Sequence, residues 1–244
     1  PDGVTFTAIS AGNSHSLALG SDGQTYAWGY ASPGLLGTGS SSDVLVPTPV
    51  ITPDGVTFTA ISAGGSHSFA LGSDGQTYAW GWEGWGALGT GNTSNVLVPA
   101  PVSTPPGVTF TAISVGVYHA LALSSDGQAY AWGQGSWGIL GTGDTSDALI
   151  PVAVSTPPGL TFTAISAGGS TSLALGSDGQ AYAWGFGGGG QLGNGNYPDA
   201  LVPVRAITDP GVTFTMISAG YGRALALTSD DQISNWGDGQ FGQL

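Results

Sequence analysis

The chain has 244 residues, including 44 glycines, 15 prolines and 8 tryptophans, and 41% of its residues are hydrophobic. It has no lysine and no cysteine, and two arginines against fifteen acidic residues leave a formal net charge of −13. This balance excludes the basic surface that nucleic acid and anionic membranes require, and it excludes disulfide bonds and thiolate metal sites.

The termini and composition indicate where the protein works. The chain begins at Pro1 without a methionine or signal sequence, so we expect it to be a processed or excised piece of a longer protein. No stretch is long and apolar enough to span a bilayer. The acidic, lysine-free, Ser/Thr/Gly-rich composition is typical of extracellular proteins, and predicts a secreted or cell-surface location.

A repeat of 52 residues organises the whole chain. Its clearest markers are two aromatic positions, Phe6, Phe58, Phe110, Phe162 and Phe214 and then Trp28, Trp80, Trp132, Trp184 and Trp236. The repeats are 1–52, 53–104, 105–156, 157–208 and a truncated 209–244, and we expect them to form one domain, 1–244. The first two repeats are identical at 40 of 52 positions, which indicates a recently duplicated or a designed array.

Each complete repeat predicts four short strands, in an order that the first repeat illustrates. Residues 4–11 (VTFTAISA) are rich in β-branched and aromatic side chains and end at Gly12, which predicts a strand leading into a turn. Residues 16–20 (SLALG) and 25–28 (TYAW) flank an Asp-Gly pair and predict a hairpin. After a glycine-rich loop, residues 44–50 (VLVPTPV) predict an edge strand, because proline cannot donate to a ladder.

The residues of the hairpin predict how repeats pack together. Leu17, Leu19, Tyr26 and Trp28 alternate with Ala18 and Ala27. We expect one bulky and one small face on each sheet, with the bulky face of one repeat packed on the small face of the next. Four antiparallel strands per repeat and no helical periodicity predict an all-β fold, a β-propeller with one blade per repeat.

The segments ISAGGSHSFALGSDGQTYAWG (61–81) and GWGALGTGN (84–92) resemble the regulator-of-chromosome-condensation (RCC1-like) repeat, of a bacterial type. The likeness covers the whole chain. It implies a propeller of about seven blades, within the usual range of roughly four to eight. Among the activities that this resemblance implies, contact with another protein through loops matches the residues of this chain best.

The fifth repeat ends before its last strand. Either the five repeats close as a ring with a three-stranded last blade, or further repeats complete a larger ring, and the sequence allows both. In either case the third strand of the last blade would be an exposed edge. We therefore predict self-association through this incomplete blade.

Residues that could carry chemistry are better explained by the scaffold. His15, His67 and His119 occupy one position in successive repeats, but Thr171 and Arg223 replace them later, so a metal site is not favoured. Glu83 is the only glutamate, has no partner carboxylate at a fixed spacing, and no serine lies in a G-x-S-x-G elbow. We expect a non-enzymatic protein with no catalytic residue, metal or cofactor.

Binding residues are expected where the repeats differ, because the constant positions are those that the fold constrains. The variable positions lie in the loop after the third strand and in the turn between the first two strands, and many are aromatic. Large aromatic residues on glycine-rich loops are typical interface anchors. The candidate binding residues are Tyr30, Trp82, Trp85, Tyr118, Trp137, Phe186, Tyr221, Arg223 and Phe241.

The sequence thus predicts a scaffold that presents variable loops on a rigid propeller, for binding a protein partner or for assembly. Two alternatives remain open. Aromatic rings on an acidic scaffold could stack on sugars, as in a carbohydrate-binding surface module. Near-identical copies could also belong to an engineered or amplified scaffold without a selected ligand.

Overall fold

The computed structural model describes residues 1–240, 242 and 244, and it is built almost entirely of short β-strands. They form five antiparallel sheets, four of four strands and a last one of three. The strands are β1 Phe6–Ala11, β2 His15–Gly20, β3 Thr25–Gly29, β4 Val44–Pro49, β5 Phe58–Ala63, β6 His67–Gly72, β7 Thr77–Gly81, β8 Val96–Pro101, β9 Phe110–Val115, β10 His119–Ser124, β11 Ala129–Gly133, β12 Ala148–Ala153, β13 Phe162–Ala167, β14 Thr171–Gly176, β15 Ala181–Gly185, β16 Ala200–Arg205, β17 Phe214–Ala219, β18 Arg223–Thr228 and β19 Ile233–Gly237.

Each sheet is one blade, and each blade corresponds to one repeat. Strands pair in sequence order within every blade, so the predicted all-β propeller architecture and the three-stranded last blade are confirmed. The Asp-Gly turns form as expected: the Asp22 carboxylate accepts a hydrogen bond from the backbone N–H of Gln24, at 3.1 Å, and Gly23 takes the positive φ of +80°. Two single-turn 3-10 helices, η1 Gly84–Gly86 and η2 Ser136–Gly138, lie in loops where the sequence predicts no helix.

The prediction of one bulky and one small face per blade is wrong. In the antiparallel register Leu17 lies opposite Ala27, and Ala18 lies opposite Tyr26. Directly opposed residues share a face, so each face combines the large side chains of one strand with the small ones of its neighbour. Leu17 and Ala27 of the first blade pack against Trp80 of the second.

Hydrogen bonds and tryptophans join consecutive blades. The hydroxyl oxygen of Ser10 accepts from the backbone N–H of Ala63 at 2.9 Å, and Ser62, Ser114 and Ser166 repeat this bond to the blade that follows each of them. The framework residues Trp80, Trp132 and Trp184 are fully buried between blades. The inter-blade contacts are therefore periodic, like the sequence, and position the loops of neighbouring blades rigidly.

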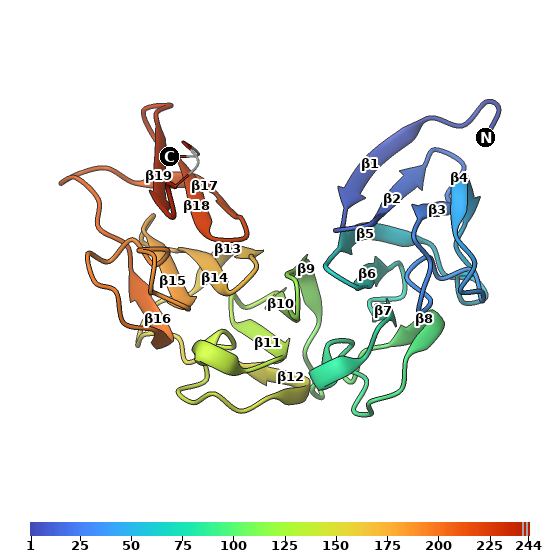
Figure 1. The fold of residues 1–244 in the computed structure, drawn as a ribbon, viewed down its shortest axis with the longest axis horizontal. Helices are drawn as coiled ribbons and strands as arrows, with labels where there is room; N and C mark the ends of the chain where they lie inside the picture. The colour runs from blue at the N-terminus through green and yellow to red at the C-terminus, as the bar shows by residue number, and fades with distance from the viewer. Residues whose placement is uncertain (241, 243) are drawn as a thin grey trace.

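The five blades follow an arc, and the first and last blades stand apart at its two ends (Figure 1). The positions that are covered between blades are exposed at these ends. Ile9 of the first blade and Met216 of the last are both largely exposed. These 244 residues therefore do not close a five-bladed ring, which was one of the two arrangements that the sequence allowed.

Among the described residues, no helix has the length and apolar character needed to cross a membrane.

Candidate functional site

The variable residues gather at one end of the blades because of the strand order. In each antiparallel blade the first strand ends where the second begins, and the third strand ends at that same edge. The backbone N–H of Tyr30, after β3, donates to the carbonyl of Ser14, in the turn after β1, at 2.9 Å. Trp82, Gln134, Phe186 and Asp238 repeat this bond in their own blades. We call this end, made of the turns after the first strands and the loops after the third strands, the loop face.

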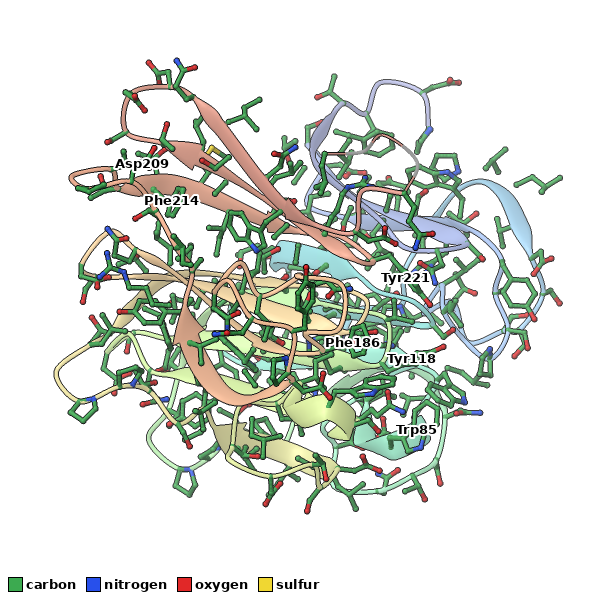
Figure 2. All side chains as sticks on the ribbon, turned by 60° about the vertical axis from the view of Figure 1, so that its left-hand side comes forward. Trp85, Tyr118, Phe186, Asp209, Phe214 and Tyr221 are labelled. Atoms are coloured by element: carbon green, nitrogen blue, oxygen red, sulfur yellow. The ribbon has the colours of Figure 1, made fainter. Side chains whose placement is uncertain are left out.

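Two aromatic clusters lie on the loop face. Trp85 contacts Trp82 edge to face, with ring centroids 4.9 Å apart, and it contacts Tyr118 of the next blade at 5.4 Å. Trp137 contacts Phe186 of the next blade at 5.8 Å. Each cluster therefore bridges two blades, and Figure 2 shows Trp85, Tyr118, Phe186 and Tyr221 along the same end of the molecule.

Trp85 and Trp137 are held in an unusual backbone conformation. Their φ angles are 59° and 60°, in the left-handed region that a bulky L-residue rarely adopts, at a cost of about 1–2 kcal/mol each. Both side chains nevertheless remain 41% exposed. Strain that leaves an aromatic ring in solvent is typical of a functional site, because packing gains little from it.

Trp82 and Phe186 are held differently. Each ring lies over the glycine two residues further along, Gly84 and Gly188, where a Cβ atom would collide with it. Both side chains are half-buried as a result. Trp82 therefore supports the loop and the Trp85 ring, while Trp85 presents the more accessible surface.

The remaining candidates are spread around the clusters. Tyr30 and Arg223 are exposed, and Tyr221 is 79% exposed. Tyr221 also lines a central depression of about 210 Å³ together with the glycine-rich turns of all five blades, among them Gly64, Gly116 and Gly168. Tyr30 and Tyr221 have no aromatic neighbour within the part of the chain that the structure describes. Phe241 lies outside the described residues.

Carboxylates hold the loops after the third strands by hydrogen bonds to backbone N–H groups. The backbone N–H of Gly135 donates to Asp147 at 2.8 Å, and Ala31 and Gly187 make the same bond to Asp43 and Asp199. In the second blade Asn95 takes this place, and the carboxylate comes from the buried Glu83. Glu83 accepts from the backbone N–H of Leu88 at 2.5 Å and from the Thr90 hydroxyl at 3.1 Å. Burial raises the pKa of Glu83 to about 7.

The histidines lie inside the propeller. His15 Nε2 is 2.8 Å from the hydroxyl of Ser68 in the next blade, and that hydroxyl donates to the carbonyl of Leu35. His119 makes the same contact with Ser172 at 2.9 Å. In both places the serine hydroxyl lies between the histidine ring and a backbone carbonyl of the preceding loop. No group of three or more His, Cys, Asp or Glu residues that could hold a metal is found among the described residues.

Sequence reasoning missed two features of the site. The sequence analysis considered Glu83 only as a catalytic residue. It did not predict that this carboxylate holds its own loop by hydrogen bonds, although Glu83 lies in the variable loop. The left-handed conformation of Trp85 and Trp137 was not predicted either. The sequence signal for this conformation is the glycine that follows each tryptophan. Gly86 and Gly138 also adopt positive φ angles, which glycine tolerates.

The exposed side chains of the loop face can make non-covalent contacts with a partner. Exposed aromatic rings supply apolar contact area and faces that attract cations, and the net charge of −13 favours basic partners. Both oxygens of Glu83 are already hydrogen-bonded within the loop. No second carboxylate is bonded to it in the described part of the chain.

Comparisons with known proteins agree with this architecture. The sequence profile of the Regulator of chromosome condensation (RCC1) repeat matches residues 22–71, 74–123, 126–175 and 178–227. The chain is 33% identical over 244 residues to the Ultraviolet-B receptor UVR8 of Arabidopsis thaliana, covering all of this chain and 56% of the receptor. It is 34% identical over 239 residues to the human E3 ubiquitin-protein ligase HERC2, covering 97% of this chain and 5% of the ligase. The chain therefore spans about half of the plant receptor and a small part of the ligase.

Solved structures show the same fold. Human WBSCR16 superimposes with a TM-score of 0.85 at 24% identity, covering 96% of this chain and 62% of that one. Prp20p of Saccharomyces cerevisiae, whose structure is described with its binding to Gsp1p and histones, gives 0.80 at 24% identity, with 98% and 57% covered.

Proposed function

The chain belongs to the regulator of chromosome condensation (RCC1) repeat family, and from that premise we propose that it is a non-enzymatic scaffold that binds a protein partner through its loop face. Proteins of this fold that have been described with partners favour such a role. Prp20p is described with Gsp1p and histones, and in a complex with Kap60, all of them partners of that protein.

The observation that carries the proposal is the pair of strained, exposed tryptophans, Trp85 and Trp137. Each heads a cluster that bridges two blades, so a partner that covers both contacts three consecutive blades at once. Hot spots of protein interfaces are enriched in tryptophan and tyrosine on rigid supports. The loop face has both properties.

The negative charge of the chain favours a partner with a basic surface. The chain carries no lysine and only two arginines, and Asp43, Asp147 and Asp199 lie at the base of the loops. A partner surface with arginine or lysine next to apolar side chains would gain from long-range attraction and from cation–π contact with the tryptophans. We propose a partner of that chemistry.

The absence of enzymatic activity is part of the proposal. The match to HERC2 covers 5% of that ligase, and its catalytic activity is not carried over to this chain. The carboxylate of Glu83 is engaged within its own loop, and the large exposed side chains of the loop face include the aromatic residues Tyr30, Trp85 and Trp137. We also propose a secreted or cell-surface location, which the acidic, cysteine-free and lysine-free composition supports.

The test is affinity capture followed by a measured dissociation constant. The chain, the variant Trp85→Ala/Trp137→Ala and the control Ile9→Ala are used as bait, and the captured protein is purified and titrated. Ile9 is exposed but lies on the open side of the first blade, away from the loop face. We expect the double variant to lose about 100-fold in affinity, from two hot-spot residues, and the control to lose none. Equal affinity for all three would reject the loop face as the site.

Two further predictions from the sequence, carbohydrate binding and self-association, can be tested with the same proteins. A carbohydrate-binding module would give saturable signals on a glycan array that Trp85→Ala removes, and we expect no such signal if the partner is a protein. Self-association through the incomplete last blade stays a prediction. Light scattering over a range of concentrations tests it, because edge-mediated association raises the mass with concentration.

A further inference from the structure

The aromatic cluster of the second blade contains rings that stand at right angles to each other. The Trp85 ring is inclined at 80° to the Trp82 ring and at 82° to the Tyr118 ring of the third blade. Perpendicular rings in contact present a face of each to the space between them, and the face of an aromatic ring attracts cations. We call these three rings the aromatic corner.

The backbone fixes the aromatic corner in a position where its rings meet solvent. Trp85 has the left-handed φ described above, and both Trp85 and Tyr118 remain exposed. The glycine after Trp85, Gly86, packs closely on the outer strand of the next blade, and a Cβ atom on it would lie 2.5 Å from Leu149 Cα. The rings are therefore in place before a ligand arrives, which lowers the entropy lost on binding.

The segments that build the aromatic corner supply no accessible carboxylate. The loop 82–95 contains a single acidic residue, Glu83, and the turn 115–118 contains none. Glu83 is fully buried, and its two oxygens accept hydrogen bonds from Leu88 and Thr90 of the same loop. A ligand in the corner therefore meets ring faces but no carboxylate from these two segments.

The other aromatic cluster of the loop face differs in this respect. The loop that carries Trp137 also contains Asp144 and Asp147, and both are exposed. Asp147 occupies the position at which the second blade has Asn95. An ordinary lysine or arginine bound at Trp137 has carboxylate acceptors in the same loop, whereas one bound at the aromatic corner does not.

Charge and shape together select the ligand of the aromatic corner. The net charge of −13 attracts a cation. The N–H groups of a lysine or arginine side chain lose water on binding and then need acceptors, which ring faces replace poorly. A trimethylated lysine keeps its charge and has no N–H on its ammonium group. Its methyl groups point in several directions and can contact two perpendicular ring faces, whereas a planar guanidinium stacks on one.

We propose that the aromatic corner of Trp82, Trp85 and Tyr118 binds a trimethylated lysine side chain of the protein partner. This inference rests on the proposed function, because it names the group by which the partner engages one part of the loop face. A protein is the source because the corner and the Trp137 cluster together span three consecutive blades. One extended protein surface can place a methylated lysine on the first cluster and an ordinary basic residue on the second.

The first experiment titrates the ¹⁵N-labelled chain with capped amino acids and follows the indole N–H signals by NMR. The probes are the N-acetyl methylamides of trimethyl-lysine, of lysine and of a neutral analogue in which carbon replaces the ammonium nitrogen. We expect saturable shifts of the Trp82 and Trp85 signals with trimethyl-lysine. The other two probes should bind about tenfold more weakly, lysine for lack of acceptors and the neutral analogue for lack of charge.

Variants of the chain separate the ring faces from folding. Trp85→Ala removes the ring that contacts both others, and we expect about tenfold weaker binding of the trimethyl-lysine probe. Tyr118→Ala should also weaken binding, and Tyr118→Phe, which keeps the ring, should restore the affinity that Tyr118→Ala loses. Tyr197→Ala is the matched control, because Tyr197 is an exposed aromatic residue of the fourth blade outside both clusters. It should bind the probe as the unchanged chain does.

The second experiment asks whether the captured partner carries the modification. Mass spectrometry of the partner should show a trimethylated lysine, and replacement of that lysine by arginine should weaken binding to the chain about tenfold. The same replacement should have no further effect on binding to the Trp85→Ala variant, because the aromatic corner is already lost there. Titration of both partner forms with both chains measures this coupling.

Several results would overturn the inference. They are equal affinity for the three probes, no saturable shift with trimethyl-lysine, or a captured partner without a methylated lysine. Each of these leaves the proposed function intact if Trp85→Ala/Trp137→Ala still weakens binding of the partner. Conversely, probe binding as expected together with equal partner affinity for the double variant and the unchanged chain would reject the loop face as a protein site, and with it the protein source of the cation.

Discussion

At the scale of single residues, His67 shows how a substitution in one repeat leaves a buried group without its partner. Its equivalents His15 and His119 contact Ser68 and Ser172 of the following blade, but Ala120 occupies that place for His67. Both ring nitrogens of His67 are buried without a hydrogen bond. A buried polar group in this state costs stability.

We predict that Ala120→Ser stabilises the chain by about 1 kcal/mol, because the new hydroxyl can bond His67 as Ser68 bonds His15. Denaturant unfolding measures the change. The same substitution in a His67→Ala background is the control and should give no gain. Destabilisation by Ala120→Ser in the unchanged chain would show that the site has no room for the hydroxyl.

The three histidines also predict how stability depends on pH. Burial lowers the pKa of His15 and His67 to about 4 and that of His119 to about 3, from 6.5. The unfolded chain therefore binds more protons between these values and pH 6.5, and stability is lost as the pH falls through this range. Glu83 acts in the opposite direction: its pKa is raised to about 7, so the folded chain binds the extra proton between pH 4.5 and 7.

We expect the three histidines to outweigh one glutamate, so that the free energy of unfolding is lower at pH 5 than at pH 7. Glu83→Gln removes the opposing contribution and should make this loss larger. Urea unfolding at both pH values measures it. Equal or higher stability at pH 5 would mean that the histidines are accessible to protons in the folded chain.

Strain at the loop-face tryptophans gives a third prediction. Trp137→Gly relieves the left-handed backbone and gives up one aromatic contact, two effects of about 1 kcal/mol that oppose each other. We expect a change in stability within about 1 kcal/mol, compared with a loss of about 3–5 kcal/mol for the buried Trp132→Ala. Equal losses in denaturant unfolding would make Trp137 a packing residue rather than a binding residue.

At the scale of elements, the turns after the first strands join the blades. The backbone N–H of Gly169 donates to the carbonyl of Gly220 in the next blade, at 3.1 Å, and the three preceding blades make the same bond. A Cβ atom on Gly168 would lie 2.5 Å from that carbonyl oxygen, whereas one on Gly222 would meet nothing closer than 3.7 Å. Close approach of two backbones therefore requires glycine at Gly168 but not at Gly222.

We predict that Gly168→Ala destabilises the chain by about 1–3 kcal/mol, as overpacking does, and that Gly222→Ala changes stability little. Thermal and denaturant unfolding of the two variants measure the difference. Similar stabilities would contradict a rigid contact between the fourth and fifth blades.

Most elements could be predicted from the sequence, because the 52-residue period fixes equivalent positions and the Asp-Gly turns fix the hairpins. The predicted strand 4–11 forms as Phe6–Ala11, for example. The faces could not be predicted by alternation alone, because they depend on the hairpin register that places Leu17 opposite Ala27.

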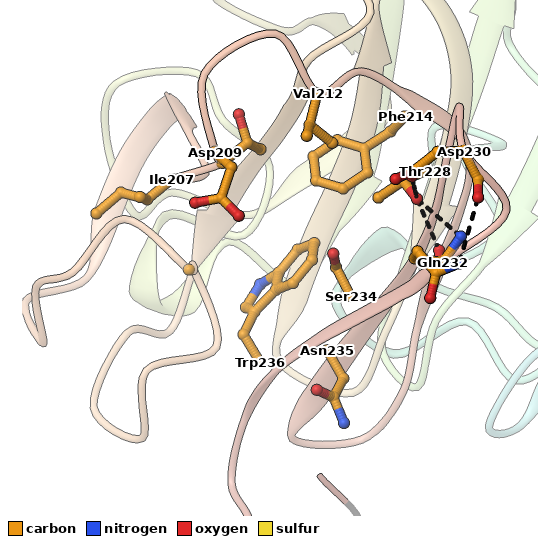
Figure 3. Close-up of a pocket in the computed structure, with 12 residues that line it drawn as sticks. Ile207, Asp209, Val212, Phe214, Thr228, Asp230, Gln232, Ser234, Asn235 and Trp236 are labelled. Atoms are coloured by element: carbon orange, nitrogen blue, oxygen red, sulfur yellow. Dashed lines mark hydrogen bonds between the residues drawn. The ribbon is translucent and has the colours of Figure 1, made fainter.

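At the scale of the whole molecule, the aromatic clusters of the loop face span three consecutive blades of the arc. The loop face carries these clusters at one end of the blades (Figure 2), and Figure 3 shows the framework residues Phe214 and Trp236 of the last blade. The loop-face residues could be predicted because they vary between nearly identical copies. Their grouping into clusters across blades could not, since it depends on the spacing and orientation of adjacent blades, which the sequence does not specify residue by residue.

The most direct test of the loop face as the partner site is hydrogen exchange of the chain alone and in complex with its captured partner. We predict slower exchange of the backbone amides in the loops around Trp85 and Trp137 and in the turn at Tyr118, with unchanged exchange in the Asp-Gly turns at the opposite end of the blades. Protection of the Asp-Gly turns without protection of the loops would contradict the account.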